Sequence, residues 1–367
     1  MDRVVITGAA GAEMSAADQL RARFDAPDAL GYGIEEELFL VDGETLDLLP
    51  KAREVHERTD GDPRFKLELM ASQLEIVTPP CRDLESAVAA LAEGRRDLAA
   101  AAAPIGRLIS AGAHPTAPEL GVLTDDPRYQ HTLDDYGERA RRQLVSGLHL
   151  HVSLGGANRT LAVYNALRSH LPELAALAAN APFHDNRDTG LASIRPTIAV
   201  NLRRQGVPPA IPSWEWFAHA LEWGAASDTV PDTRRWWFEL RLHATYGTLE
   251  MRVPDAQASV ADVHGVAAFA FGLVDALAAR YDAGEPLSVH DTWRIDENRW
   301  SAMRDGVGGT LADLDTGERV PTRELLRSRI PNLHPETERL IEANGAIRTR
   351  QAGLDGAAAY LADQFLS

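Results

Sequence analysis

The sequence predicts an α+β fold built on a mainly antiparallel β-sheet with helices packed on one of its faces. Several short segments alternate apolar residues with glutamate, histidine or arginine, so each predicted strand has one apolar and one polar face. Longer segments with helical periodicity separate these strands along the chain. The helices would cover the apolar face of such a sheet, and the polar side chains would line a trough on the other.

Composition limits the kinds of partner that this trough can face. The 367-residue chain carries a net charge of −17, which argues against nucleic acid or an anionic membrane as the main partner. No apolar run approaches the roughly 18 residues of a membrane span. The single cysteine, Cys81, excludes an internal disulfide, so we expect a cytoplasmic protein.

The sequence shows no internal repeat and no linker-like stretch, so we expect one domain over residues 1–367. Residues 1 to about 28 are predicted to form a flexible tail, and residues from about 288 to 367 a helical C-terminal part. The sequence does not fix the oligomeric state, and a homodimer is one candidate assembly.

The first predicted strand, residues 31–41, reads GYGIEEELFLV. Glu35 and Glu37 share one of its faces, about 6.6–7 Å apart, and Glu36 points to the other face. Two like charges so close are unfavourable unless a cation lies nearby. The pair indicates either a solvated edge strand or a site for a hard cation such as Mg²⁺, and this strand alone does not decide between them.

Two more carboxylates, Glu68 and Glu75, lie within residues 66–78, which read KLELMASQLEIVT. Their separation of seven places them on opposite faces of a regular strand. They can share one site only if a bulge intervenes or if they belong to different segments. Taken alone, each could equally be a partly exposed strand residue.

The following stretch is predicted to contain a helix, a strand and a long loop. Asp83 caps a helix that runs to about Ala103, and residues 105–113 have the composition of a strand. A loop then runs to about Tyr129. This loop contains Arg128, which is either an anion contact or an ordinary surface arginine.

The clearest alternation lies at residues 146–154, SGLHLHVSL, where His149 and His151 share one face. A His-x-His pair on a strand is a common metal-ligand arrangement. It can equally be two hydrogen-bonded histidines on a polar sheet face, so both interpretations stay open at this point.

The next part of the sequence gives less regular signals. Residues 160–180 predict an amphipathic helix, and residues 181–212 predict a long loop of the kind that often covers an active site. A short helix follows, on which Trp214, Trp216 and Trp223 are expected to be buried anchors.

Residues 236–253 predict a hairpin with one apolar and one charged face, followed by a long helix that begins near Ser259. The charged face carries both acidic and basic side chains, namely Glu239, Arg241, His243, Glu250 and Arg252. That mixture suits metal-chelated phosphate, because carboxylates can hold the cation while arginines hold the phosphoryl oxygens.

Together the predicted strands bring Glu35, Glu37, His149, Glu250 and Arg252 into one polar trough. So many carboxylates need divalent cations to offset their repulsion, and Mg²⁺ favours carboxylates together with substrate phosphates. The arginines can hold a transferring phosphoryl group. The sequence has no G-x-x-x-x-G-K-[ST] motif, so the pattern indicates ATP-dependent chemistry without a P-loop.

Several of these segments carry a family resemblance. The sequence is similar to the bacterial and archaeal carboxylate–amine ligases of the glutamate–cysteine ligase type 2 family at GIEEELFLV, LELMASQLEIVTPP, AGAHP, SGLHLHVSL, WWFELRLHATYGTLEMRVPD and ENRW. The matches run in this order from about residue 31 to 302. The resemblance implies a single catalytic domain with a glutamine-synthetase-like fold, in which a curved antiparallel sheet holds ATP and Mg²⁺ on its concave face.

The resemblance also implies a reaction and residue roles. ATP would phosphorylate the side-chain carboxylate of glutamate, and the amine of cysteine, or another amine, would then displace the phosphate. Arg252 would steady the phosphoryl group, Arg241 would hold substrate, and Arg128 is added as a candidate cofactor contact. His151 is not needed as a ligand and would support its neighbour His149. The implied metal ligands are Glu35, Glu37, Glu68, Glu75, His149 and Glu250.

Two other interpretations remain. The first is a metallohydrolase that uses His149 and His151, which would need further histidine or aspartate ligands at strand ends. The second is a catalytically silent nucleotide-binding relative, which would have no reason to keep a repulsive set of carboxylates. ADP release that depends on an amino acid would separate the ligase from the hydrolase, and ATP binding without turnover would favour the silent relative.

Overall fold

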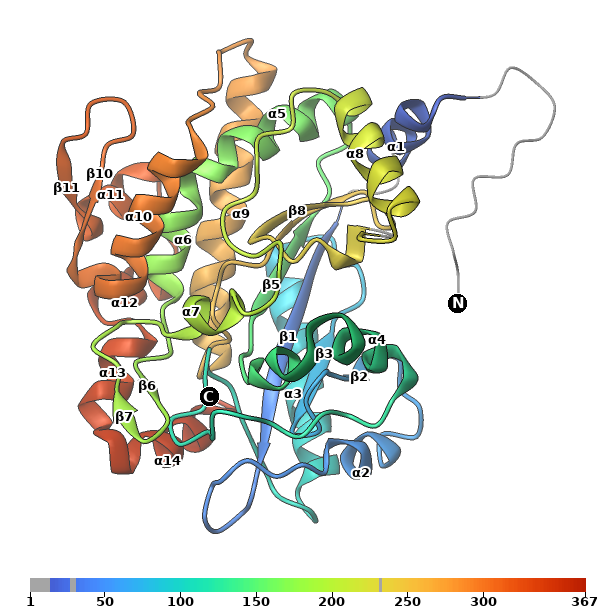
Figure 1. Ribbon diagram of the computed structural model, residues 1–367. Coiled ribbons are helices and arrows are strands. Elements are labelled where there is room, and N and C mark those ends of the chain that lie inside the picture. Colours follow the sequence, from blue (N-terminus) through green and yellow to red (C-terminus); the bar gives the residue numbers. More distant parts are fainter. Residues whose placement is uncertain (1–13, 27–30, 231–232) are drawn as a thin grey trace.

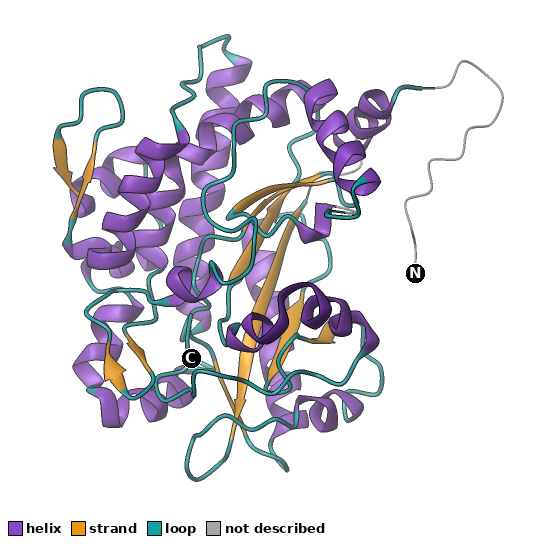
Figure 2. Ribbon diagram, viewed as in Figure 1, coloured by secondary structure: helices purple, strands orange, loops and turns teal. Residues whose placement is uncertain are grey.

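A seven-stranded antiparallel sheet lies at the centre of the molecule (Figures 1 and 2). The computed structural model describes residues 14–26, 31–230 and 233–367. The strands follow the spatial order β2–β3–β1–β5–β9–β8, and β4 pairs with β1. Every pairing in this sheet is antiparallel, which confirms the predicted strand arrangement. The strands are β1 (Tyr32–Val41), β2 (Phe65–Leu67), β3 (Gln73–Val77), β4 (Arg107–Ile109), β5 (Leu148–Val152), β8 (Leu240–His243) and β9 (Thr248–Met251).

The middle strand, β1, has two different faces. Ile34 and Leu38 point into an apolar cluster and are completely buried there. The same cluster includes residues of α3 (Leu84–Ala102) and α9 (Val260–Asp282). Because successive side chains point to opposite faces of a sheet, Glu35 lies on the face turned away from this cluster.

The core side of β1 also carries one charged residue, Glu36, which is completely buried against Arg95 of α3. The Nε and Nη2 atoms of Arg95 donate to the two carboxylate oxygens at 2.8 and 2.5 Å. Its remaining N–H groups donate to the backbone carbonyls of Gln257, Ala258 and Phe365. A buried ion pair is tolerated only when its polar atoms are satisfied in this way.

Helices, short 3₁₀ turns and two small hairpins surround the sheet (Figure 1). The two hairpins are formed by β6 (Phe183–His184) with β7 (Arg187–Asp188) and by β10 (Thr310–Ala312) with β11 (Arg319–Pro321). The other helices are α1 (Ala16–Asp25), α2 (Ala52–Glu57), α4 (Pro127–Tyr136), α5 (Ala157–Leu167), α6 (Leu171–Ala178), α7 (Arg195–Ala199), α8 (Trp214–Ala226), α10 (Thr292–Asp305), α11 (Thr322–Arg329), α12 (Pro335–Glu342), α13 (Gly345–Ala352) and α14 (Leu354–Gln364). The 3₁₀ turns are η2 (Gly137–Arg142), η3 (Arg168–His170), η4 (Thr233–Arg235) and η5 (Gly306–Gly308).

The structure corrects two expectations about the predicted tail and loop. Within the predicted flexible tail, α1 is a helix, because Phe24 is buried against Trp214 with the ring centroids 5.0 Å apart. The rest of that tail, residues 1–13 and 27–28, lies outside the described residues. Arg128 lies on helix α4 and not in a loop, because the side chain of Asp126 caps the helix and Pro127 favours its first turn.

Two further expectations hold only in part. The strand predicted over residues 105–113 is limited to the three residues of β4. Of the predicted tryptophan anchors, Trp214 is buried, whereas Trp216 and Trp223 are 40% and 63% exposed. These two lie on the face of α8 turned away from its buried residues, because on a helix both are rotated about 180–200° from Trp214.

Helix α9 corrects the expectation that no segment is apolar enough to span a membrane. The helix is long and apolar enough to cross a membrane, but 61% of its most apolar 18-residue stretch is buried inside the protein. Its buried side chains belong to the same apolar cluster as β1. A core helix needs the same composition, so α9 carries no argument for a membrane.

The loop after β4 contains a pH-sensitive histidine. His114 is completely buried; its Nδ1 accepts from the Thr116 amide at 3.2 Å, and its Nε2 lies 2.9 Å from the Leu46 carbonyl. Burial lowers the pKa of His114 to about 4, below the ordinary value of 6.5. Between these values the unfolded chain binds more protons, so the free energy of unfolding falls as the pH drops.

We expect this histidine to contribute about 2 kcal/mol of destabilisation between pH 7.5 and pH 5. Urea unfolding at both values should show that His114→Gln loses most of this contribution, because an amide can keep both hydrogen bonds without titrating. The exposed His131→Gln serves as the matched control. An unchanged pH dependence in His114→Gln would contradict the assignment.

Candidate active site

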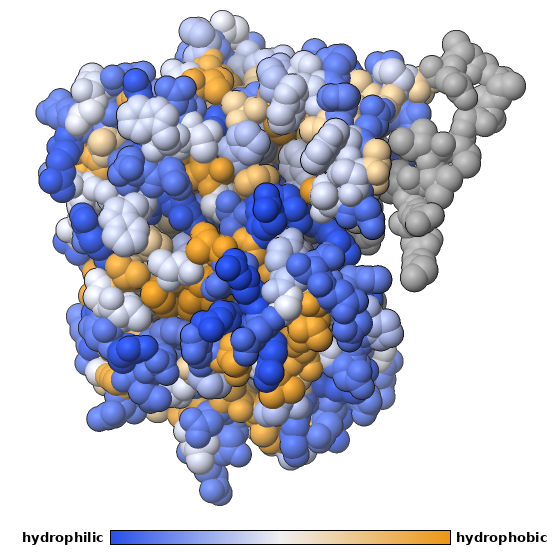
Figure 3. Space-filling view, in the orientation of Figure 1, coloured by the Kyte–Doolittle hydropathy of each residue, from blue (hydrophilic) through white to orange (hydrophobic). Residues whose placement is uncertain are grey.

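The polar face of the sheet carries a row of ionisable side chains that crosses neighbouring strands. Residues that lie opposite each other in an antiparallel pair point to the same face, with Cβ atoms about 4.5–5.5 Å apart. Near the centre of the face seen in Figure 3, strongly hydrophilic residues gather in front of the sheet. From β3 to β8, the strand register aligns Glu75 with Glu37, Glu35 with His149, His151 with Glu250, and Glu250 with Arg241.

Glu35 lies in the middle of this row between two histidines. Its Oε2 atom is 3.5 Å from Nδ1 of His149 and 3.6 Å from Nε2 of His151. Burial opposes its ionisation, but its contacts with His149 and His151 outweigh burial and hold the pKa of Glu35 well below its usual value. Glu35 is therefore a carboxylate at neutral pH, and it is ready to bind a cation.

Both histidines present a buried nitrogen without a hydrogen-bond partner. Among the described residues, Nε2 of His149 and Nε2 of His151 accept and donate no hydrogen bond. Burial, and then the charge of Arg252, lower the pKa of His149, which keeps its imidazole in the neutral form that binds metals. Buried polar nitrogens usually have a partner, so these two atoms are candidate metal ligands.

Two groups of side chains around Glu35 have the spacing of cation sites. Glu35, Glu75 and His149 form one group, and Glu35, His151 and Glu250 form the other. Within each group the ligand atoms lie within 4.8 Å of one another. His151 thus takes part in the second group, although the sequence assigned it only a supporting position.

Glu68 and Glu75 reach the trough from different segments, which was one of the two conditions for their sharing a site. Glu75 lies on β3, and Glu68 follows the last residue of β2. Burial, and then the charge of Glu37, raise the pKa of Glu68 to about 8. Burial and the charge of Glu68 raise the pKa of Glu75, and Lys66 is its nearest cation, with Nζ 3.4 Å from Oε2. Lys66 therefore offsets only part of the repulsion between these carboxylates.

At the other end of the row, two arginines bind one carboxylate. Nε and Nη2 of Arg241 donate to the two oxygens of Glu250 at 2.5 and 2.7 Å. Nη1 of Arg252 donates to Glu250 Oε1 at 2.5 Å and lies 3.4 Å from Nδ1 of His149. Burial opposes ionisation, but these two guanidinium groups keep the pKa of Glu250 well below its usual value. The Nε and Nη2 atoms of Arg252 make no hydrogen bond among the described residues, so they remain available to a substrate.

Two predicted residues have partners outside this row. The guanidinium of Arg128 pairs with Asp126 at 3.0 Å and its side chain is 62% exposed. Glu239 does not join the trough arginines, because it pairs with Arg299 of α10 at 2.6 Å. Cofactor binding by Arg128 stays a prediction.

Comparisons with known proteins decide the family. The sequence profile of the glutamate–cysteine ligase family 2 matches residues 32–357, which is most of the chain. The chain belongs to the glutamate–cysteine ligase family 2. The glutamate–cysteine ligases of Natronomonas pharaonis and Haloferax volcanii are 35% and 34% identical to it, over 85% and 92% of this chain and 87% and 98% of theirs.

Solved structures show the same fold for this family member. A glutamate–cysteine ligase from Francisella tularensis, solved in complex with AMP, matches with a TM-score of 0.64 and 11% identity over 92% of this chain and 89% of its own. A bifunctional glutathione synthetase from Pasteurella multocida matches with a TM-score of 0.61 and 17% identity over 95% of this chain and 53% of its own. These identities establish the fold alone. Family membership makes the protein an ATP-dependent ligase.

The sequence missed one basic residue of the ligase's trough, Arg195 on α7. Its Nη2 donates to the carbonyl of Arg252 at 3.1 Å and its Nη1 to the carbonyl of Val253 at 3.2 Å. A Cβ at Gly147 would lie only 2.4 Å from Nη2 of Arg195, so glycine makes room for this side chain. Arg195 comes from a segment without periodicity, and only the pairing of distant segments reveals its position.

The single cysteine of the ligase lies beside β1 at the start of α3. Its thiol donates to the Pro79 carbonyl at 3.2 Å, and burial, and then Asp83, raise the pKa of Cys81. With its pKa raised in this way, the thiol is not stabilised as a thiolate by the helix start. We expect Cys81→Ser to keep most of the activity in a turnover assay. A loss beyond about 100-fold, roughly 2.7 kcal/mol of barrier, would contradict this.

Proposed function

We propose that this ligase joins the side-chain carboxylate of glutamate to the amine of cysteine. The γ-phosphoryl group of ATP passes to the glutamate carboxylate and gives an acyl phosphate and ADP. The amine then attacks the acyl carbon and loses a proton, the bond to phosphate breaks, and γ-glutamylcysteine and phosphate leave. A cytoplasmic location suits a protein whose one cysteine is a free thiol.

The observation that carries this proposal is the row of carboxylates that ends in two arginines. Glu75 lies at one end of the row, and Glu35 lies in its middle beside the two histidines. Arg241 and Arg252 converge on Glu250 at the other end. A phosphoryl donor held by cations needs both kinds of group within one site. A curved glutamine-synthetase-like sheet would present them on its concave side.

Mg²⁺ is the metal that we propose for this trough. Glu35, Glu75 and His149 would hold one ion, and Glu35, His151 and Glu250 would hold a second. The orphaned imidazole nitrogens and the raised pKa of Glu75 fit a group that binds a cation. When bound, Mg²⁺ would neutralise the charge of the ATP phosphates.

Glu250 and the two arginines would position the phosphoryl group. Arg241 donates hydrogen bonds to both oxygens of Glu250 and so holds this carboxylate in place. Glu250 in turn accepts a hydrogen bond from Nη1 of Arg252 and would fix the orientation of that guanidinium group. The remaining N–H groups of Arg252 would then donate to the phosphoryl oxygens. A preorganised donor of this kind stabilises charge that develops in the transition state.

The experiment that tests the proposal is a screen of ADP release with Mg²⁺-ATP over pairs of amino acids and amines. We expect the highest rate with glutamate and cysteine together and little ADP release with either alone. If a different pair gives the highest rate of ADP release, the proposed ligase reaction stands but its two substrates are that pair. ATP binding without turnover of any pair would contradict the proposal.

A metallohydrolase is less well supported by the arrangement of ligands. Each of the two candidate cation groups around Glu35 contains one histidine and two glutamates. His149 and His151 therefore belong to different groups and do not act as a shared pair. Hydrolytic zinc sites draw mainly on histidine ligands, often with one carboxylate, whereas carboxylate-rich groups suit harder cations.

A further inference from the structure

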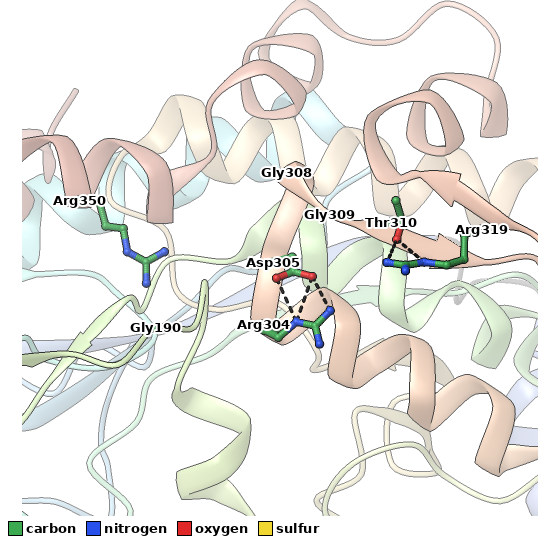
Figure 4. A pocket seen from close by; sticks show the side chains of 8 residues that line it. All are labelled: Gly190, Arg304, Asp305, Gly308, Gly309, Thr310, Arg319 and Arg350. Atoms are coloured by element: carbon green, nitrogen blue, oxygen red, sulfur yellow. Dashed lines mark hydrogen bonds and ion pairs between the residues drawn. The ribbon is translucent and has the colours of Figure 1, made fainter.

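A polar cavity with a volume of about 500 Å³ is lined mainly by residues of the C-terminal part of the chain. It forms where the end of α10 and η5 meet β10, β11, α13 and the loop after β7 (Figure 4). No residue of the trough lines it. The lining residues are Gly190, Arg304, Asp305, Gly308, Gly309, Thr310, Arg319 and Arg350.

Two of the three arginines in this cavity are held by carboxylates. Nε and Nη2 of Arg304 donate to Asp305 at 2.7–3.0 Å, and Nε and Nη2 of Arg350 donate to Asp188 at 3.1 and 2.8 Å. These contacts fix the two side chains at the wall. Ordered guanidinium groups lose less conformational entropy when they bind a ligand.

The third arginine has no acid beside it. Arg319 of β11 donates from Nε and Nη2 to the hydroxyl of Thr310 at 2.9 and 2.6 Å, and among the described residues it pairs with no carboxylate. Three arginines against Asp305 and Asp188 leave one positive charge at the cavity. In a chain with a net charge of −17, an uncompensated cation of this kind indicates a place for an anion.

In each of the three guanidinium groups, the Nη1 nitrogen is free of hydrogen bonds to the described residues. The hydrogen bonds of Arg304, Arg319 and Arg350 use only Nε and Nη2, so Nη1 of each makes none among the described residues. Figure 4 shows the three side chains arriving from three different elements around the cavity. Donors that come from several elements around one cavity can share an oxyanion, whereas a single surface arginine offers one contact.

Glycines bring the backbone close to the same space. A Cβ at Gly309 would lie 2.4 Å from Cβ of Asp305, so position 309 tolerates only glycine. A Cβ at Gly308 would meet no atom within 4 Å, so a side chain can be added there without a clash. Gly308 therefore offers a position from which the cavity can be altered.

We propose that this cavity binds a small oxyanion that carries at least two negative charges, such as a phosphate or a compact polycarboxylate. Arg319 provides the uncompensated charge, and Arg304 and Arg350 provide further donors. The affinity should fall with ionic strength, because the cavity is open to solvent at its arginines. The proposal does not depend on the reaction in the trough.

Calorimetric titration of the full chain with inorganic phosphate and, separately, with citrate tests the proposal at low ionic strength. We expect at least one of the two to bind, and Arg319→Ala to weaken that binding about 10- to 100-fold, the loss of one charge-assisted contact. Preference for one probe identifies the chemistry of the anion. If neither anion binds the wild-type protein, the proposal is overturned.

Two further variants separate the cavity from other anion contacts, including those in the trough. Gly308→Glu adds a competing carboxylate and should weaken binding as Arg319→Ala does. Arg294→Ala removes an exposed arginine of α10 that donates to the Leu314 carbonyl outside the cavity, and it should leave the affinity unchanged. Circular dichroism checks that each variant folds. Wild-type affinity in folded Arg319→Ala or folded Gly308→Glu would overturn the proposal.

Discussion

Replacing Glu35 by glutamine is expected to abolish turnover while leaving the fold nearly intact. Glu35 belongs to both candidate cation groups, so the amide removes one charge from each. We expect kcat to fall at least about 10³-fold, which corresponds to roughly 4 kcal/mol of barrier. A steady-state ADP-release assay and circular dichroism would measure the two effects.

The thermal stability of Glu35→Gln separates cation binding from simple repulsion. If Glu35 and Glu37 only repel each other, the substitution should raise Tm and keep activity. If Glu35 holds Mg²⁺, the stabilisation of the wild-type protein by Mg²⁺-ATP should be lost in the variant. Glu44→Gln in the exposed turn after β1 is the matched control. Full activity in Glu35→Gln would remove this residue from the site.

Replacing Arg252 by lysine is expected to remove most of the turnover, although the substitution keeps the positive charge. The guanidinium of Arg252 holds Glu250 with Nη1 and leaves Nε and Nη2 for phosphoryl oxygens, whereas a lysine offers one point charge. The charge of the phosphoryl group is spread over three oxygens during transfer, so a fork stabilises the transition state more than the ground state. We expect kcat to fall about 10²–10³-fold, with a smaller change in KM for ATP.

The competing explanation is that Arg252 only pairs with Glu250, a contact that the structure contains. A lysine could make that contact, so near-normal kcat in Arg252→Lys would move Arg252 out of the active site. Arg107→Lys, at an exposed arginine paired with Asp363, controls for the substitution itself. If kcat falls while KM for ATP changes little, the interaction of Arg252 is made mainly in the transition state.

The strand residues of the trough could be predicted because strand alternation is a local property. Glu35, His149, Glu250 and Arg252 each follow an apolar residue at a period of two, so the sequence alone placed them on polar faces. Glu68 and Glu75 were ambiguous, because their segment breaks into two strands at a point that periodicity does not mark.

Other features depend on contacts between distant segments, which a single sequence does not contain. Arg195 reaches Arg252 and Val253 across more than fifty residues of chain. The pairing of Glu36 with Arg95 joins a strand residue to a helix residue that periodicity alone would count as ordinary. The arginine cavity likewise forms only when α10, β11 and α13 come together.

The buried pair of Glu36 and Arg95 also bears on misfolding. A slip of β1 by one residue would turn Glu35 and Glu37 into the apolar core and leave one glutamate in the trough. Arg95 can neutralise one buried carboxylate and not two, and an unpaired buried charge costs several kcal/mol. The salt bridge therefore disfavours the shifted register of β1 relative to the native one. If both residues were made apolar, the yield of active protein after refolding would fall.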